Sequence, residues 1–520
     1  MRAIDYFDKS ADAYPNRIAM IDRGTSYSYR ETRAMSEKVA RAVWAAGVQP
    51  GERIAILSQN DARVLVCVLG TYRAGAAWVP INARNAVDAN VEYMNYVEAS
   101  WLFYHSSFAA QVDELKKRIP TLRTLVCIDS EDRGNPSLAS LMEKTGDVPE
   151  KDWGDPLGNP DELVGVVPTG GTTGPAKGVR VTNLAWGTMI EMACHYWNGR
   201  EAVCLSVAPL SHAAGVVAFA AFAMGATNVI LPGFDAKEVM QAIERYKVTH
   251  IFLPSTAFYK LLALREVRQF NCSSLRIFLL AGSPVSPEQF KKGVEIFGPC
   301  MCQCYGQTEA PMLLTWLDPK SVAAAASGDH PERLRSCGKQ TSSVRLAVMN
   351  DKGQLLPTRQ TGEIVARGAL VTPGYYKMPE ATAEVRKFGW HHTGDVGYQD
   401  EGGYFYIVDR KKDMIITGGF NVFSAEVEAG IMTLEGVEEC AVIAVPDETW
   451  GEAVKGIVVL RKGVSLSEKD IIDHCKAKLG GMKSPKSVEF RTEIPKTPAG
   501  KIDHRSLRAP YWVGRDRAVH

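Results

Sequence analysis

Hydrophobic and polar positions along the first half of the chain follow a repeating order of helices and short strands. Residues 31–46 carry Ala, Val and Trp at helical spacing, and a Pro-Gly turn separates them from the apolar strand at 53–57. The same order recurs at 62–80, at 239–254 and again up to a strand at 275–281. Because strands separated by helices of this length form right-handed βαβ units, the pattern predicts a mostly parallel, buried sheet.

From about residue 345 the pattern changes to shorter strands with Gly-rich turns, at 362–368 and 402–408. The charged segment 409–413 follows. Beyond it, the chain has its own alternation of helices and strands, which is typical of a small α+β unit.

A chain of 520 residues is too long for a single hydrophobic core. We therefore predict an α/β protein with a large N-terminal domain, 1–409, and a small α+β C-terminal domain, 410–520. The large domain is expected to combine mostly parallel sheets flanked by helices with a β-rich subdomain. The boundary is expected at 409–412.

The charge balance excludes some classes of partner. The formal net charge is +1, so no excess positive charge would gather a nucleic acid or an anionic membrane. The most apolar stretch, 213–231, is rich in Ala and Gly and is interrupted by Thr227 and Asn228. We interpret it as a buried helix leading into a strand, not as an integral membrane segment.

The first residues lack the apolar run of a secretory signal, and the 11 cysteines are an odd number, so we expect a reducing, cytoplasmic location. Cys300, Cys302 and Cys304 alternate along the chain. This spacing suits one face of a strand, and no C-x-x-C pair or nearby histidine supports a metal site there.

A Gly- and Thr-rich segment at 168–178 follows the apolar strand at 163–167. Its glycines let backbone N–H groups turn toward an anion, and its hydroxyls and lysine add donors and charge. The residues that carry this expectation are Thr169, Gly170, Gly171, Thr172, Thr173, Gly174 and Lys177. A P-loop requires Gly before the lysine and a hydroxyl after it, whereas Ala176 and Gly178 stand here, so a P-loop NTPase is disfavoured.

The segment is followed, in order, by further motifs at 209–215, 281–284, 305–309, 389–395, 409–410, 418–422 and 495–501. Together they resemble the signatures of the adenylate-forming superfamily, in its acyl-CoA synthetase branch, over nearly the whole chain. The resemblance implies a large domain that binds nucleotide and acid and a small mobile C-terminal domain.

Residue by residue, the resemblance implies a nucleotide site that uses ATP and Mg²⁺. Adenine and ribose would be bound by Gly282, Ser283, Pro284, Tyr305, Gly306, Asp395, Ile407 and Arg410. Glu309 would hold Mg²⁺, and Thr308 would donate to the α-phosphate. Lys501 would bridge the acid and the nucleotide, where two anions must meet and the transition state carries extra charge.

The acid and thiol sites follow from the same resemblance. The acid pocket would be formed by His212, Ala213, Ala214, Gly215, Gly306, Ala310 and Met312, with His212 as a catalytic gate at its mouth. Lys412 corresponds to the hinge, and Gly418, Gly419, Phe420 and Asn421 to the path of coenzyme A. The chain departs from the family pattern at Gly170, where serine is usual, Asn183, where histidine is common, and Ser424, where proline is common.

We therefore expect an ATP-dependent carboxylic acid–CoA ligase that forms an acyl-adenylate and then an acyl-CoA. The small, apolar pocket segments favour an uncharged fatty, aryl or arylalkanoic acid. Two alternatives remain open, an enzyme that loads a carrier protein and a luciferase-like oxidoreductase. The sequence also leaves the oligomeric state open, a homodimer included.

Overall fold

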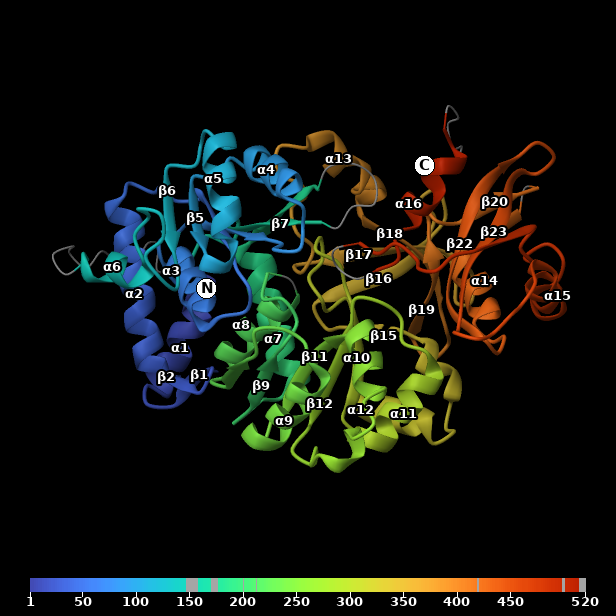
Figure 1. The fold of residues 1–520 in the computed structure, drawn as a ribbon, viewed down its shortest axis with the longest axis horizontal. Helices are drawn as coiled ribbons and strands as arrows, with labels where there is room; N and C mark the ends of the chain where they lie inside the picture. Colours follow the sequence, from blue (N-terminus) through green and yellow to red (C-terminus); the bar gives the residue numbers. More distant parts are fainter. Residues whose placement is uncertain are drawn as a thin grey trace. The chain divides into compact units, whose positions relative to one another are not determined.

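The computed structural model describes residues 1–145, 158–169, 176–199, 201–211, 213–418, 420–497 and 501–513. The described chain forms two compact units (Figure 1). Unit 1 takes its residues from Met1–Thr169, Pro175–Leu346 and Ala366–Arg386, and unit 2 from Ala347–Val365 and Lys387–His520. The predicted hinge at 409–412 lies within unit 2 and stays a prediction.

Unit 1 contains two sheets. The first has the order β6 (Thr124–Cys127), β5 (Trp101–Tyr104), β3 (Arg53–Leu57), β4 (Ala77–Ile81), β7 (Leu163–Pro168) and β8 (Gly178–Thr182). Its neighbours are parallel except for β7 and β8, which form an antiparallel pair.

The second sheet of unit 1 runs in the order β2 (Thr25–Ser28), β1 (Ile18–Asp22), β10 (Thr227–Ile230), β9 (Val203–Ser206), β11 (His250–Pro254), β12 (Ile277–Ala281), β13 (Met301–Tyr305), β14 (Thr315–Leu317) and β15 (Gly338–Gln340). In this order, the strands between β1 and β13 are parallel to their neighbours. At the two ends of the sheet, β2, β14 and β15 pair antiparallel. The predicted parallel, buried sheet is therefore confirmed.

Most helices of unit 1 lie along the faces of these sheets (Figure 1). The helices of unit 1 are α1 (Asp5–Ala13), α2 (Tyr29–Ala45), α3 (Ala62–Arg73), α4 (Val87–Tyr96), α5 (Ala109–Arg118), α6 (Leu138–Glu143), α7 (Asn183–Trp197), α8 (Ala213–Ala223), α9 (Ala236–Tyr246), α10 (Ser255–Leu262), α11 (Pro287–Phe297), α12 (Pro319–Ala326) and α13 (Pro379–Glu384). Local sequence accounts for their ends, as at α2, where Ser28 and Glu31 form a reciprocal capping box.

The apolar stretch at 213–231 forms α8, which is buried over most of its length, and then β10, as predicted. A helix that is apolar all round belongs in a protein core. Among the described residues, no helix combines the length and the apolar character that crossing a membrane requires.

Unit 2 contains the antiparallel pair β18 (His391–Gln399) and β19 (Tyr404–Arg410). β16 (Val344–Met349) and β17 (Gly362–Gly368) contribute residues to both units. A separate sheet has the order β21 (Phe420–Val422), β20 (Ile415–Thr417), β23 (Gly451–Leu460) and β22 (Val437–Asp447), and β24 (Ser487–Phe490) pairs in parallel with β23. With α14 (Ser424–Ile431), α15 (Glu468–Leu479) and α16 (His504–Arg508), it forms the predicted small α+β fold around its own apolar core.

Candidate active site

The carboxyl ends of neighbouring parallel strands place one group of predicted residues at an edge of the second sheet. Gly282, Ser283 and Pro284 follow β12 directly, at the edge where ligands bind in open α/β sheets. The Ser255 hydroxyl, after β11, donates to the Ser283 carbonyl oxygen at 2.8 Å, and the Ser283 hydroxyl donates to Ser255 Oγ at 3.0 Å. Gly282 has a φ of +91°, which a side chain would oppose. The contact of this segment with adenine stays a prediction.

The loop after β13 carries the predicted residues Tyr305, Gly306, Thr308, Glu309, Ala310 and Met312. A Cβ on Gly306 would lie 2.5 Å from the Met312 carbonyl carbon, so only glycine lets the two backbones approach this closely. The Gln307 N–H donates to the Ala310 carbonyl oxygen at 3.0 Å. The loop is therefore tightly closed, and its fold brings the predicted metal ligand and pocket residues together.

The Glu309 side chain is held by Tyr375, a residue that the sequence analysis missed. The Tyr375 hydroxyl donates to Glu309 Oε1 at 2.7 Å, and the Thr372 N–H donates to the Glu309 carbonyl oxygen at 2.9 Å. Burial, and then the charge of Glu309, raise the pKa of Tyr375, so its hydroxyl remains a donor. No spacing pattern joins the two residues, because they lie 66 positions apart.

Glu309 is also the candidate ligand for a metal ion. Among the described residues, its Oε2 accepts no hydrogen bond, and no three or more His, Cys, Asp or Glu side chains gather into a metal-binding group. A cation here would therefore bind one carboxylate oxygen together with phosphates and water, which is how Mg²⁺ is commonly held in nucleotide sites. The residues present fit this ion.

The β7–β8 pair brackets the predicted phosphate segment. Pro168 faces Gly178 across the ladder, and the Thr169 N–H donates to the Lys177 carbonyl oxygen at 2.9 Å. The Lys177 ammonium lies 5.0 Å from the centre of the Tyr375 ring, within the range of a cation–π contact. Gly170, Gly171, Thr172, Thr173 and Gly174 lie outside the described residues, so their contacts with phosphate stay predictions.

The predicted acid pocket includes the start of α8, with Ala213, Ala214 and Gly215. A Cβ on Gly215 would lie 2.1 Å from the Leu210 carbonyl oxygen, so this position has no room for a side chain. The missed residue Asn60 organises the segment before it. Its Oδ1 accepts from the Leu210 N–H at 2.8 Å, and its Nδ2 donates to the carbonyl oxygens of residues 207, 208 and 231. His212 lies outside the described residues.

In unit 2, Asp395 and Arg410 face each other across β18 and β19. Arg410 Nε lies 3.0 Å from Asp395 Oδ1, and Asp395 is 2% exposed. The Asp395 N–H donates to Thr393 Oγ1 at 3.1 Å, which helps to fix the turn. Ile407 pairs with Gly397 on the same two strands. The predicted ribose-binding pair is therefore preassembled, although its ligand is untested.

Lys501 forms two hydrogen bonds with Thr497. The Thr497 N–H donates to the Lys501 carbonyl oxygen at 2.7 Å, and the Lys501 N–H donates to Thr497 Oγ1 at 3.2 Å. Desolvation lowers the pKa of Lys501 to about 8, and the charges of Arg410 and Lys412 act in the same direction. The Asp395 carboxylate acts in the opposite direction. Lys501 is exposed at the surface of unit 2.

The predicted hinge is anchored from two sides within unit 2. The Ser424 N–H and hydroxyl both donate to the Asp409 carboxylate, the hydroxyl at 3.0 Å. Arg508, which the sequence analysis missed, donates to the Lys412 carbonyl oxygen at 3.2 Å and to Asp413 Oδ1 at 2.8 Å. Because Arg508 belongs to α16, the segment after Lys501 is tied directly to Lys412.

The predicted path for coenzyme A begins at Gly418, which has a φ of +56°. A Cβ there would lie 2.6 Å from the ring of Trp450, and the Gly418 N–H donates to the Trp450 carbonyl oxygen at 2.9 Å. Trp450 and Phe420 are both exposed large side chains, and Asn421 lies beside Phe420 in β21. Gly419 lies outside the described residues.

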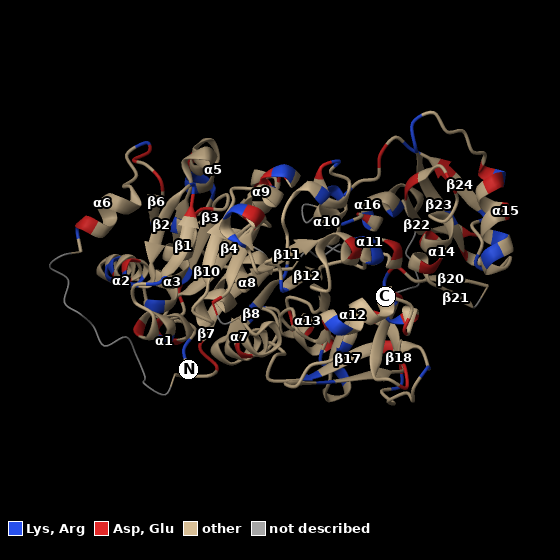
Figure 2. Ribbon diagram, turned by 90° about the horizontal axis from the view of Figure 1, so that it is seen from below, with Lys and Arg blue, Asp and Glu red and all other residues tan. Residues whose placement is uncertain are grey.

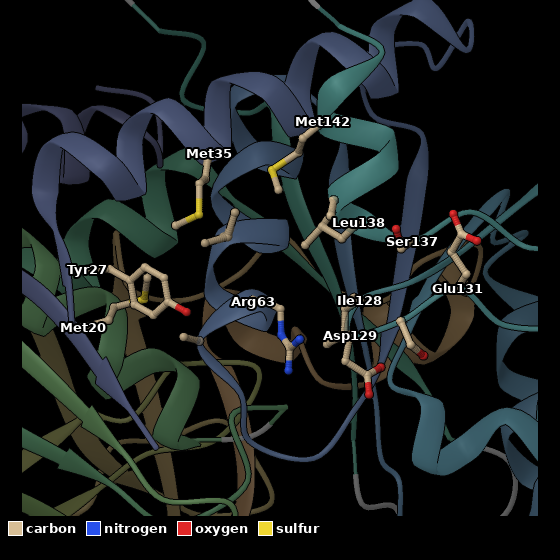
Figure 3. A pocket seen from close by; sticks show the side chains of 14 residues that line it. Met20, Tyr27, Met35, Arg63, Ile128, Asp129, Glu131, Ser137, Leu138 and Met142 are labelled. Atoms are coloured by element: carbon tan, nitrogen blue, oxygen red, sulfur yellow. The ribbon is translucent and has the colours of Figure 1, made fainter. Parts of the chain in front are cut away.

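A cavity of about 270 Å³ lies elsewhere in unit 1, between α2, α3 and α6 (Figure 3). Met20, Met35 and Met142 line its apolar part, and Arg63 and Asp129 lie at its polar end. None of the predicted site residues lines it. Basic and acidic positions both occur on many elements of the described part of the chain (Figure 2).

Comparison with known proteins supplies independent information. Residues 7–376 match the family described as AMP-binding enzyme, and residues 426–501 match the family described as AMP-binding enzyme C-terminal domain. The medium/long-chain-fatty-acid–CoA ligase FadD8 of Mycobacterium tuberculosis is 38% identical over 372 residues, which is 69% of this chain and 63% of that protein, less than two thirds of its length.

Feruloyl-CoA synthase of an Amycolatopsis species is 34% identical over 496 residues, which is 94% of each chain. Among solved structures, the amide bond synthetase McbA from Marinactinospora thermotolerans has a TM-score of 0.87 at 29% identity, covering 98% of this chain and 100% of that one.

Proposed function

Because this chain belongs to the AMP-binding enzyme family, we propose that it joins an uncharged fatty, aryl or arylalkanoic acid to coenzyme A through an acyl-adenylate. The coarser activity follows from the family and the relatives. The chain is an AMP-forming acid–thiol ligase with ATP, CoA and a carboxylic acid as substrates. The class of acid and the roles of individual residues are the proposal.

The observation that carries the proposal is the charge arrangement of unit 2. Asp395 offers a buried carboxylate that can accept from ribose hydroxyls, Arg410 is paired with it, and the Lys501 ammonium is near enough for both charges to affect its pKa. An exposed ammonium beside these charges is placed to meet two anions, the carboxylate of the acid and the α-phosphate.

In the proposed first step, a carboxylate oxygen of the acid attacks the α-phosphorus of ATP. A bond from this oxygen to phosphorus forms, the bond from phosphorus to the bridging oxygen breaks, and pyrophosphate leaves. The protein contributes position and fixed charge. Lys501 bridges the two anions, and Glu309 is the residue that would hold Mg²⁺, which neutralises phosphate charge when bound.

In the second step, the thiolate of CoA attacks the carbonyl carbon of the acyl-adenylate. The carbon–oxygen bond breaks, and AMP leaves with the oxygen that came from the acid. Gly418 and the Trp450 ring above it are the residues we propose beside the incoming thiol.

An uncharged tail is supported by the small and apolar residues near the predicted pocket. Ala310 and Ala214 are buried, and Gly215 and Gly306 exclude side chains by close backbone contact. Two relatives also act on such acids, by their names a medium- or long-chain fatty acid and ferulic acid. An apolar pocket discriminates only weakly between acids whose tails differ by one methylene group, so we expect several acids to be accepted.

The test is pyrophosphate release with ATP and Mg²⁺ across a panel of fatty, aryl and dicarboxylic acids, with and without CoA. We expect release only with some uncharged-tail acids, accompanied by the matching acyl-CoA. Activity confined to dicarboxylates would contradict the proposed acid class. Release that CoA never discharges would indicate another acceptor, such as a carrier protein or an amine, and the likeness to an amide bond synthetase makes amines the first acceptors to try.

A further inference from the structure

Tyr375 occupies a rigid position beside the predicted phosphate segment. Its backbone forms a bridge with Val179 in β8, and its N–H donates to Thr382 Oγ1 at 3.0 Å. The Tyr376 N–H, next in the chain, donates to the Gly178 carbonyl oxygen at 2.7 Å. The segment is therefore fixed against the strand that begins directly after Lys177.

The Tyr375 side chain contacts two predicted site residues at once. It is 8% exposed, its hydroxyl donates to Glu309 Oε1 at 2.7 Å, and its ring centre lies 5.0 Å from Lys177 Nζ. Thr372, three residues earlier, donates through its N–H and its hydroxyl to the Glu309 carbonyl oxygen, at 2.9 and 3.1 Å. One short segment therefore holds both the backbone and the carboxylate of Glu309.

Among the residues that the structure describes, these contacts fix one carboxylate oxygen of Glu309, and the other accepts no hydrogen bond. The terminal torsion of a carboxylate side chain has a broad distribution. A ligand that needs one orientation of the carboxylate binds more weakly, because fixing that orientation costs conformational entropy. A hydrogen bond from a buried phenol removes part of this freedom beforehand. The ring restrains the Lys177 ammonium on the other side in the same way.

We propose that Tyr375 is a positioning residue that aligns the Glu309 carboxylate with the cation of bound MgATP and aligns Lys177 with its phosphates. This inference rests on the proposed function of the same site. Tyr375 itself does not touch the reacting atoms and acts through Glu309 and Lys177.

The test compares Tyr375→Phe, which removes only the hydroxyl, with Tyr375→Leu, which also removes the aromatic face. Tyr376→Phe is the matched control, because the Tyr376 hydroxyl contacts Glu98 at 3.3 Å and neither Glu309 nor Lys177. ATP binding to the full chain is measured by calorimetry over a series of Mg²⁺ concentrations, without acid or CoA. Thermal unfolding of each variant checks that it is folded.

For Tyr375→Phe we expect the Mg²⁺ concentration at half-maximal ATP binding to rise about tenfold, the size expected for losing a hydrogen bond to a charged group. Binding without Mg²⁺ should change less than about twofold, because the ring contact with Lys177 remains. Tyr375→Leu should weaken ATP binding with and without Mg²⁺, and Tyr376→Phe should match the wild type.

A Glu309→Gln background separates positioning from a general structural role. If Tyr375 acts through the carboxylate, adding Tyr375→Phe to Glu309→Gln should change the Mg²⁺ dependence less than about twofold, since coupled residues are not additive. An Mg²⁺ response of Tyr375→Phe equal to that of the wild type would overturn the inference, and so would full additivity in the double variant. ATP binding needs no acid, so an enzyme that binds MgATP but turns over no acid would contradict the proposed function alone.

Discussion

At the scale of single residues, Lys501 is the most informative position. Its ammonium lies near two other cations, Arg410 and Lys412, and near the Asp395 carboxylate. Because its pKa is lowered, its charge depends on pH in a range where most lysines remain fully protonated.

The lowered pKa leads to a prediction for the pH dependence of adenylation. Lys501 is charged below its pKa of about 8 and neutral above it, so kcat/KM for pyrophosphate release, which reports the free enzyme, should fall as pH rises through about 8. In Lys501→Arg the guanidinium stays charged, so any remaining activity should lack this descending limb.

The measurement is a pH profile of initial rates at low acid and ATP concentrations. A wild-type profile that stays flat to well above pH 9 would contradict the prediction. A limb that persists unchanged in Lys501→Arg would assign the titration to another group.

At the scale of elements, the junction between β19 and α14 shows what one departure from the family pattern does. Ser424 stands where proline is common, and proline has no N–H. Here the Ser424 N–H and hydroxyl both donate to Asp409, which is 6% exposed. The serine therefore satisfies a buried carboxyl that a proline could not.

This junction should make the stability of the chain depend on pH. Burial is the main cause that raises the pKa of Asp409 from 3.8 to about 7. A raised pKa in the folded state means that the contribution of Asp409 to stability is full below its ordinary value and is lost as pH rises through about 7. Asp409→Asn, which does not titrate, should therefore gain stability relative to the wild type between pH 5 and pH 8.

Urea unfolding of both proteins at several pH values measures this difference. Ser424→Ala removes a hydrogen bond that lowers the pKa of Asp409 but leaves the carboxyl in place, so its stability should also fall as pH rises, and the fall should extend to a higher pH than in the wild type. A wild-type-minus-variant difference that is constant from pH 5 to pH 8 would show that Asp409 does not titrate in this range.

The elements themselves were largely predictable. The strands at 53–57, 250–254 and 362–368 and the buried helix before β10 agree with the structure, because apolar periodicity is a local property of the sequence. Tyr375 and Asn60 were not predictable in this way. Tyr375 bonds to Glu309, 66 positions away, and Asn60 bonds to Leu210, 150 positions away. No local sequence pattern indicates contacts over such separations.

At the scale of the whole molecule, adenylation and thioester formation require different groups beside the reacting atoms of one enzyme. The family resemblance predicts that a hinge at Lys412 supplies them in turn. The structure adds that the Lys412 carbonyl oxygen accepts from Arg508, on the helix α16 that follows Lys501 in the chain. Any change of backbone at Lys412 must therefore rearrange or carry along α16.

Lys412→Pro should impair thioester formation more than adenylation, because proline restricts φ and resists rotation at the hinge. Lys412→Ala removes the charge but keeps the backbone freedom, so it serves as the control. The two half-reactions are followed separately, as pyrophosphate release and as discharge of added acyl-AMP by CoA. Equal losses in both half-reactions of Lys412→Pro would count against a hinge at this position.

The proposed reaction begins with attack of the acid's carboxylate on the α-phosphorus of ATP. The most direct measurement is a reaction with acid whose two carboxyl oxygens are ¹⁸O, followed by mass spectrometry of AMP and pyrophosphate. We expect one ¹⁸O atom in AMP and none in pyrophosphate, because the attacking oxygen leaves with the nucleotide when CoA forms the thioester. Unlabelled AMP, or label in pyrophosphate or phosphate, would contradict it.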